Sequence, residues 1–473
     1  MRAELGTVKE PGRCLLVRGR RRVGKSRLVE TFVDSTGAPT VYFTASKQGS
    51  KELELFGAEV MASDLPEAGL FVGVRPGTWD AALRLLAQAL PDDQGSIVVV
   101  DEFPYLLEHD PTIEATFQKQ WDRLLSRKPV LLVLIGSDLS MMEALNAHDR
   151  AFYQRGSEMV VPPLTPVETA RTVGAASAAD AFDAYLVTGG LPLICDEWPA
   201  GMPMWEYLEE ALAEPTSALI VSAERALAAE FPVQALARSV LTQIGSGETT
   251  FSSIARAAGG LQATSANRAL DLLRAKRAVA REVPLSTQAS KEARYRITDS
   301  YLRFWLYFVG PHLAEIERGR SDRVLARIRA GWTSWRGRAV EPVVREALAR
   351  LLPLSGLSSG AVGGYWTRTN TPEVDLVGAD RAPVAKAITF TGSIKWLENE
   401  PFDGADLNLL TASTAHVPGA GPGTPLVAVS RSGVTARPAV ALGPDELMEA
   451  WVTRSRAGRH PRPGHRATTT SGS

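Results

Sequence analysis

The sequence is poor in cysteine and histidine and has no excess of charge of either sign. Its 473 residues include two cysteines and six histidines. Two cysteines exclude a disulfide framework and a cysteine-rich zinc site, and no two histidines stand at helical ligand spacing. The 52 Lys and Arg residues balance 53 Asp and Glu residues, giving a net charge of −1. This balance excludes a basic field over the whole protein, so any contact with nucleic acid must be local.

Long apolar runs are also missing. No stretch of 18 apolar residues occurs, and the first residues, MRAELGTVKEPGR, lack the apolar centre of a signal peptide. We therefore expect a cytoplasmic protein without a membrane partner. The length and the hydrophobic content of 45% are typical of a globular protein with several domains.

The first part of the chain predicts an α/β fold. Apolar runs at 13–19, 40–46, 96–103 and 129–138 are predicted strands, and helical patterns separate them. Because strands buried on both faces lack polar alternation, these runs indicate a parallel sheet with helices on both sides. The expected architecture is the αβα core of a P-loop NTPase.

Residues 19–26, GRRRVGKS, match the pattern G-x-x-x-x-G-K-[ST]. The pattern predicts a loop whose N–H groups surround phosphate, with Lys25 at the β- and γ-phosphates of ATP and Ser26 on Mg²⁺. A strand before the loop and a helix after it favour this interpretation over a chance match. The x positions need no particular residue, so the three arginines also fit solvated loop charges. The predicted nucleotide contacts are Gly19, Arg20, Arg21, Arg22, Val23, Gly24, Lys25, Ser26 and Arg27.

Later segments supply further candidates for an ATPase site. Asp101 ends a predicted strand and is expected to hold Mg²⁺, and Glu102 is the expected general base. Ser137 ends the next strand and is the candidate sensor of the γ-phosphate, although a helix cap has the same pattern. Arg155 is the candidate for neutralising charge in the transition state, with a surface arginine as the alternative.

Three helical patterns and two strand patterns after residue 230 predict a winged helix. The helices are expected at 234–244, 252–258 and 264–275, and the strands at 278–284 and 293–299. In a DNA-binding winged helix the third helix contacts phosphates and bases, whereas other winged helices only pack on an ATPase. The candidate DNA contacts are Asn267, Arg268, Arg274, Lys276, Arg277 and Arg281.

Several motifs in order resemble a known family. They are GRRRVGKSRL, YFTAS, VVVDEFPYL, LIGSDLSMME, PLTP and YLVTGGLPL, followed by YRITDSYLRFWLYFV and GSIKW. In this order they resemble archaeal-type ATPases of the STAND/AAA+ superfamily, over most of the chain. The resemblance implies an ATPase core, a winged helix and a PD-(D/E)XK nuclease-like domain. We accordingly expect an ATPase core at 1–165, a helical lid at 166–230, a winged helix at 231–310, a connector helix at 311–336, a nuclease-like domain at 337–453 and a disordered basic tail at 454–473.

The sequence departs from this family in two places. The F-V-G-R-E-like box that helps to hold adenine is missing before Gly19, so we expect a weakened adenine contact or a natural start further upstream. In the nuclease-like domain the resemblance assigns Glu341 to the helix acid, Asp375 to the strand acid and Lys395 to the final lysine. Ser393 stands where a further acid is required, which weakens a Mg²⁺ site and predicts a domain that binds or packs without cutting.

The combined features predict an ATP hydrolase that acts as a nucleotide-dependent switch. Its expected cofactors are ATP and Mg²⁺, and its expected partner is DNA or a protein. An ATP-dependent nuclease or another DNA-processing enzyme is the alternative. The sequence does not indicate the oligomeric state.

Overall fold

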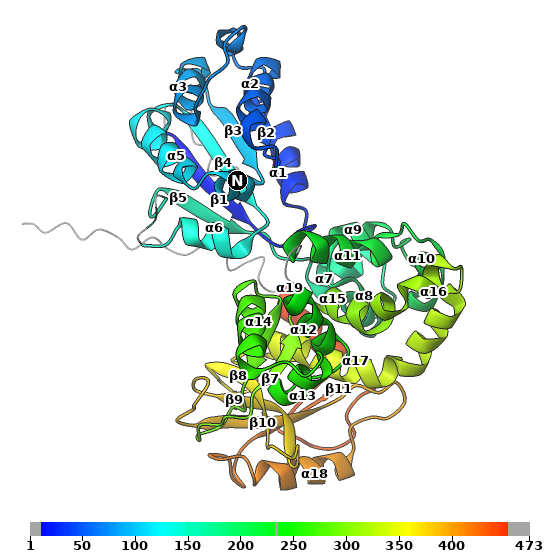
Figure 1. Ribbon diagram of the computed structural model, residues 1–473. Coiled ribbons are helices and arrows are strands. Elements are labelled where there is room, and N and C mark those ends of the chain that lie inside the picture. The colour runs from blue at the N-terminus through cyan, green and yellow to red at the C-terminus, as the bar shows by residue number, and fades with distance from the viewer. Residues whose placement is uncertain (1–10, 149, 151, 232–234, 453–473) are drawn as a thin grey trace, which may run out of the picture. The chain divides into compact units, whose positions relative to one another are not determined.

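The computed structural model describes residues 11–148, 150, 152–231 and 235–452 (Figure 1). The predicted basic tail lies outside the described residues. The chain divides into two compact units. Unit 1 consists of residues 1–164, 191–193 and 267–279, and unit 2 of residues 165–190, 194–266 and 280–473. The six expected domain ranges stay predictions.

Unit 1 contains a five-stranded parallel sheet in the order β2-β3-β4-β1-β5. The sequence predicts four of these strands, and β3 and β4 are buried along their whole length. It does not predict β5, because this edge strand, GSEMV, is largely solvent-accessible and has no apolar run. The strands are β1 (Arg13–Arg18), β2 (Thr40–Thr44), β3 (Ser96–Asp101), β4 (Val130–Gly136) and β5 (Gly156–Val160).

Helices cover both faces of this sheet, as the apolar runs predict. Alternate residues of each strand enter two separate apolar clusters, so that Leu16 belongs to one cluster and Val17 to the other. Val29 and Phe32 of α1 join the Val17 cluster, whereas residues of α2 to α6 join the Leu16 cluster. The helices are α1 (Lys25–Asp34), α2 (Glu52–Ala62), α3 (Trp79–Ala89), α4 (Phe103–His109), α5 (Thr112–Arg123) and α6 (Leu139–Leu145).

The next part of the chain is mainly helical. Its helices are α7 (Pro166–Val173), α8 (Ala178–Thr188), α9 (Pro192–Asp196), α10 (Met204–Ala213), α11 (Ala218–Glu230), α12 (Ala235–Gly245), α13 (Phe251–Ala257), α14 (Ala263–Ala275), α15 (Ser300–Phe304) and α16 (Leu313–Glu317). After α14, the strands β6 (Val279–Glu282) and β7 (Arg294–Ile297) pair in a two-stranded sheet. Three helices followed by a strand pair are the elements that the winged-helix interpretation requires, and that interpretation stays a prediction. Among the described residues, no helix is long and apolar enough to span a bilayer.

One helix of 31 residues, α17 (Ser321–Leu351), runs through the expected boundary between connector and C-terminal domain. Gly337 and Pro342 favour a break there, and the sequence analysis accordingly separates two helices. The helix continues because it buries an apolar side along its length, from Val324 and Ile328 to Val344 and Leu348. Tertiary packing therefore outweighs local propensity in this segment.

A second, mixed five-stranded sheet follows α17, in the order β12-β11-β10-β9-β8. Strands β8 to β10 pair antiparallel and β10 to β12 pair parallel. Leu285, from the segment after β6, lies in the apolar core of this sheet and donates its N–H to the Gly364 carbonyl. The elements are β8 (Ala361–Trp366), β9 (Glu373–Ala379), β10 (Ile388–Lys395), α18 (Gly404–Thr414), β11 (Leu426–Ser430), β12 (Val440–Leu442) and α19 (Pro444–Val452).

Candidate functional site

The predicted phosphate loop connects the end of β1 to the start of α1. Gly24 has a φ of 86°, a conformation that favours glycine. A Cβ on Gly19 would lie 2.4 Å from the Val161 carbonyl oxygen, so this position also requires glycine. The Lys25 side chain is buried beneath the loop, and its Nζ donates to the Gly19 and Arg20 carbonyls at 2.9 Å each. The loop therefore curls around its own lysine.

The arginines of the loop take different positions. Arg21 donates to the Tyr105 hydroxyl and lies 5.8 Å from the centre of the Tyr105 ring. Arg22 adopts a φ of 67°, which shows how tightly the loop turns. Arg27 is exposed on the surface of α1, one residue beyond Ser26. The predicted contacts from 19 to 27 thus form one continuous turn at the amino end of α1, where N–H groups attract anions.

Asp101 and Glu102 lie at the carboxyl end of β3. Asp101 is buried, and its two carboxylate oxygens accept different hydrogen bonds. Oδ1 accepts from the Glu102 N–H at 2.8 Å, and Oδ2 accepts from the Tyr42 hydroxyl at 3.1 Å. Glu102 has a φ of 52° and precedes α4. A non-glycine residue in this strained conformation is typical of functional sites.

Ser137 contacts the side chain of Glu102. It follows β4, and its hydroxyl donates to Glu102 Oε2 at 2.8 Å, with Oε1 at 3.1 Å. Because β1, β3 and β4 are parallel neighbours, their carboxyl ends share one edge of the sheet. The structure thus places four sequence-predicted residues, Lys25, Asp101, Glu102 and Ser137, at this edge.

The structure does not bring Arg155 to this edge. Arg155 directly precedes β5, whose first residue, Gly156, pairs with Cys14 near the amino end of β1. Its guanidinium Nε donates to Asp122 at 2.8 Å. In a parallel sheet the amino ends of the strands lie at the edge opposite the phosphate loop. The sequence analysis does not include β5, and it is the register of β5 that places Arg155 near the amino end of β1. The role of Arg155 in neutralising charge stays a prediction.

Ser26 and Asp101 have the chemistry of a magnesium site. A hydroxyl and a carboxylate are the hard oxygen ligands that Mg²⁺ prefers, and a nucleotide-bound Mg²⁺ needs only one or two of them from the protein. Tyr42 of β2 lies between the two groups. Burial and the Asp101 carboxylate raise the pKa of Tyr42, while a hydrogen bond with Ser26 lowers it. Within the described ranges, no cluster of three or more Asp, Glu, His or Cys residues could hold a metal by itself.

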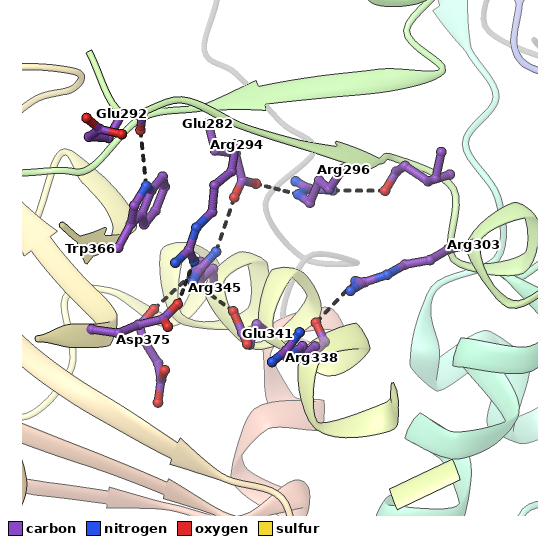
Figure 2. Close-up of polar contacts among 12 residues, drawn as sticks. Glu282, Glu292, Arg294, Arg296, Arg303, Arg338, Glu341, Arg345, Trp366 and Asp375 are labelled. Carbon is purple, nitrogen blue, oxygen red and sulfur yellow. Dashed lines mark hydrogen bonds and ion pairs between the residues drawn. The ribbon is translucent and has the colours of Figure 1, made fainter. Parts of the chain in front are cut away.

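The sequence-predicted nuclease-like residues Glu341 and Asp375 lie around an arginine in unit 2 (Figure 2). Arg345 Nη2 donates to Glu341 Oε2 at 3.0 Å, and Arg345 Nε donates to the Asp375 main-chain carbonyl at 3.0 Å. Arg345 Nη1 lies 3.5 Å from Glu282 Oε2, on the strand β6. Arg345 therefore contacts the Glu341 carboxylate and the main chain of Asp375.

Burial changes the ionisation of these two acids. It raises the pKa of Glu341 to about 7, although Arg345 opposes the change. It also raises the pKa of Asp375, against hydrogen bonds that Oδ2 accepts from the Ile394 N–H at 2.8 Å and the Ser393 hydroxyl at 3.0 Å. The residue that replaces the missing acid thus donates a hydrogen bond to the remaining one.

Lys395 forms a different contact. Its Nζ donates to Asp406 Oδ2 on α18 at 2.8 Å and lies 3.8 Å from Glu400. The hydrogen bond with Asp406 raises the pKa of Lys395. The structure brings Glu341 and Asp375 together but pairs Lys395 with an acid that the sequence analysis does not identify.

Comparisons with known proteins support the resemblance. Residues 8–144 match the family model of an AAA domain, and residues 305–404 match that of archaeal and bacterial proteins of unknown function. This confirms the family resemblance. Residues 8–144 are thus similar to an AAA domain, and the predicted α/β class is confirmed, with a separate mixed sheet later in the chain.

Individual relatives are distant. An uncharacterized protein of Methanocaldococcus jannaschii is 24% identical over 371 residues, 77% of this chain and 79% of the relative. The Walker-type ATPase of Pyrococcus abyssi is 19% identical with a TM-score of 0.45, covering 64% of this chain and 93% of that one. The Aeropyrum pernix ORC2 protein, solved as ADPNP-ADP complexes, is 11% identical with a TM-score of 0.42, covering 68% and 90%.

Proposed function

We propose that this protein binds and hydrolyses Mg-ATP and uses the cycle as a conformational switch on a macromolecular partner. The observation that carries the proposal is the convergence of Lys25, Asp101, Glu102 and Ser137 at the carboxyl edge of the unit 1 sheet, beside a loop shaped for phosphate. The AAA domain match over residues 8–144 supports the same activity.

Each residue has a role that follows from its position. The buried Lys25 ammonium exchanges its contacts with loop carbonyls for the β- and γ-phosphate oxygens of ATP. Ser26 and Asp101 hold Mg²⁺, which when bound neutralises charge on these phosphates. Glu102 accepts a proton from the attacking water. Ser137 orients the Glu102 carboxylate through the hydrogen bond of 2.8 Å that it donates.

Substitution of Lys25 tests the site. Lys25→Ala removes the ammonium and is expected to abolish Mg-ATP binding or to lower turnover by at least about 100-fold, since a charge-assisted contact of roughly 3 kcal/mol or more is lost. Binding of a fluorescent ATP analogue and phosphate release are the measurements. Lys119→Ala, at an exposed lysine of α5 in the same unit, is the matched comparison and should retain much more activity. Unchanged affinity and turnover in Lys25→Ala would sink the assignment.

We further propose that the C-terminal domain does not cut DNA. The Arg345 contacts with Glu341 and Glu282, the serine at position 393 and the pairing of Lys395 with Asp406 all support this proposal. Supercoiled plasmid incubated with the protein and Mg²⁺ or Mn²⁺ should stay intact. Cleavage that disappears in Lys395→Ala would instead establish the ATP-dependent nuclease.

The partner in this proposal is DNA or another protein. Asn267, Arg268 and Arg274 of α14 are exposed, as a helix that contacts DNA requires. The rate of ATP hydrolysis with and without duplex DNA separates the two partners. A rise of several-fold that falls steeply with added salt indicates DNA, because phosphate contacts release counterions. A rate that DNA leaves unchanged indicates a protein partner.

A further inference from the structure

The hydroxyl of Tyr42 lies among the residues that the phosphate loop and β3 contribute to the nucleotide site. Tyr42 is in β2 and pairs in register with Val99, two residues before Asp101. Two residues of a strand span roughly 6.6 Å, a distance that a tyrosine side chain can bridge. Its hydroxyl reaches Asp101 Oδ2 at 3.1 Å. The ring is half-buried and packs against the apolar cluster that contains Val17 and Val99, on the face of the sheet opposite Val41 and Phe43.

The hydrogen bond between Tyr42 and Asp101 has a definite direction. A carboxylate oxygen can only accept, so the Tyr42 hydroxyl is the donor to Asp101 Oδ2 at 3.1 Å.

This hydrogen bond leaves the Asp101 carboxylate able to accept a cation. Asp101 is held at both oxygens, by Tyr42 on Oδ2 and by the Glu102 N–H on Oδ1. Each oxygen still has lone pairs for a metal ion or its water ligands. A carboxylate fixed in this way loses little rotational freedom when the ion binds.

We propose that Tyr42 is a positioning residue that orients Asp101 for the magnesium ion of Mg-ATP. This inference rests on the proposed function, because it requires ATP to bind at the phosphate loop. It assigns to Tyr42 a role in metal affinity, separate from contact with the nucleotide itself. Removal of the hydroxyl should therefore affect the metal-dependent part of binding.

The test is Tyr42→Phe in the full chain, which removes one oxygen atom and keeps the ring. Binding of a fluorescent ATP analogue is titrated with Mg²⁺, and Mn²⁺ binding in the presence of ATP is followed by electron paramagnetic resonance. Loss of a residue that orients a metal ligand typically lowers metal affinity about 10- to 100-fold. We expect the Mg²⁺ concentration for half-maximal effect to rise by about tenfold. Affinity for the analogue in EDTA should stay unchanged, and turnover should recover at high Mg²⁺.

Tyr207→Phe is the matched control. Tyr207 carries a buried hydroxyl without a hydrogen-bond partner among the described residues, and it lies in unit 2. Its Mg²⁺ curve should superimpose on that of the unaltered chain. A superimposed curve for Tyr42→Phe would overturn the inference, as would an equal loss of affinity with and without Mg²⁺. If the unaltered chain itself fails to bind the analogue, the proposed function fails instead.

Discussion

Replacement of Arg345 should lower the stability of unit 2. Its guanidinium contacts Glu341, Glu282 and the Asp375 carbonyl, which come from α17, β6 and β9 (Figure 2). The side chain is only 14% exposed. Arg345→Met keeps the length and the helix propensity of the side chain and removes the charge. Two carboxylates then remain in a partly buried site without this cation.

The magnitude follows from burial. Breaking a fully buried ion pair costs about 3–5 kcal/mol, because the remaining charge is uncompensated. Glu341 and Glu282 keep 25% and 27% of their side chains exposed, and water therefore screens them in part. Glu282 also keeps its ion pair with Arg296, and Glu341, with a pKa of about 7, can take up a proton when Arg345 is removed. We therefore expect a loss of about 2 kcal/mol in the free energy of unfolding, below that range. With a denaturant slope of about 3 kcal/mol/M, the urea midpoint of unit 2 falls by about 0.7 M.

Tryptophan fluorescence during urea unfolding reports mainly on this unit. Of the ten tryptophans, Trp79 and Trp121 lie in unit 1 and the other eight in unit 2. Arg350→Met is the matched control, because Arg350 also pairs with a glutamate four residues earlier on α17. That glutamate is 54% exposed, so even with the Arg350–Trp451 cation–π contact the loss should stay near 1 kcal/mol or below. Equal urea midpoints for Arg345→Met and Arg350→Met would refute the reasoning. The double variant Arg345→Met, Glu341→Gln should recover part of the lost midpoint, and no recovery would also refute it.

Two further outcomes are expected. Gly19→Ala places a Cβ 2.4 Å from the Val161 carbonyl oxygen and should cost about 1–3 kcal/mol and weaken binding of a fluorescent ATP analogue. Gly69→Ala, with no atom within 4 Å of its Cβ, should leave binding unchanged, and equal effects would contradict the argument. Glu341→Gln should flatten the pH dependence of unit 2 stability in urea titrations. The folded pKa of Glu341, about 7, exceeds its ordinary 4.5, so protonation adds on the order of 3 kcal/mol as pH falls from 7 to 4.5, and an unchanged profile would exclude this.

The ATPase core follows from the sequence because its signals are local and strong. Four strands are continuous apolar runs in the sequence. The loop between β1 and α1 needs glycine at positions 19 and 24, and these are the two fixed glycines of the phosphate-loop pattern. Asp101 and Glu102 are predictable because the carboxyl ends of parallel strands meet at one edge. Ser137 is predictable in the same way, whereas its hydrogen bond to Glu102 depends on side-chain geometry that no pattern contains.

The features that the sequence analysis misses depend on neighbours in space. The edge strand β5 has too few apolar residues to be recognised, and its omission misplaces Arg155. Tyr42 has the appearance of an ordinary strand residue, and only the register of β2 against β3 brings its hydroxyl to Asp101. The one sequence feature that could have indicated its role is a tyrosine near the end of β2, the strand that pairs with β3, at whose end Asp101 lies. In α17, the continuous packed side outweighs Gly337 and Pro342, whose local effect predicts a break.

The structure shows what the Ser393 side chain does, which the mismatch with the family motif alone does not reveal. An acid at this position would place a third carboxylate beside Asp375 and Glu341, and only a bound cation could compensate that repulsion. With serine, the hydroxyl donates to Asp375 at 3.0 Å, and one arginine suffices for the charge that remains. A serine at position 393 and an arginine at position 345 therefore both limit the uncompensated negative charge of this site. Together they support a site that joins β6 to the C-terminal sheet instead of holding a catalytic metal.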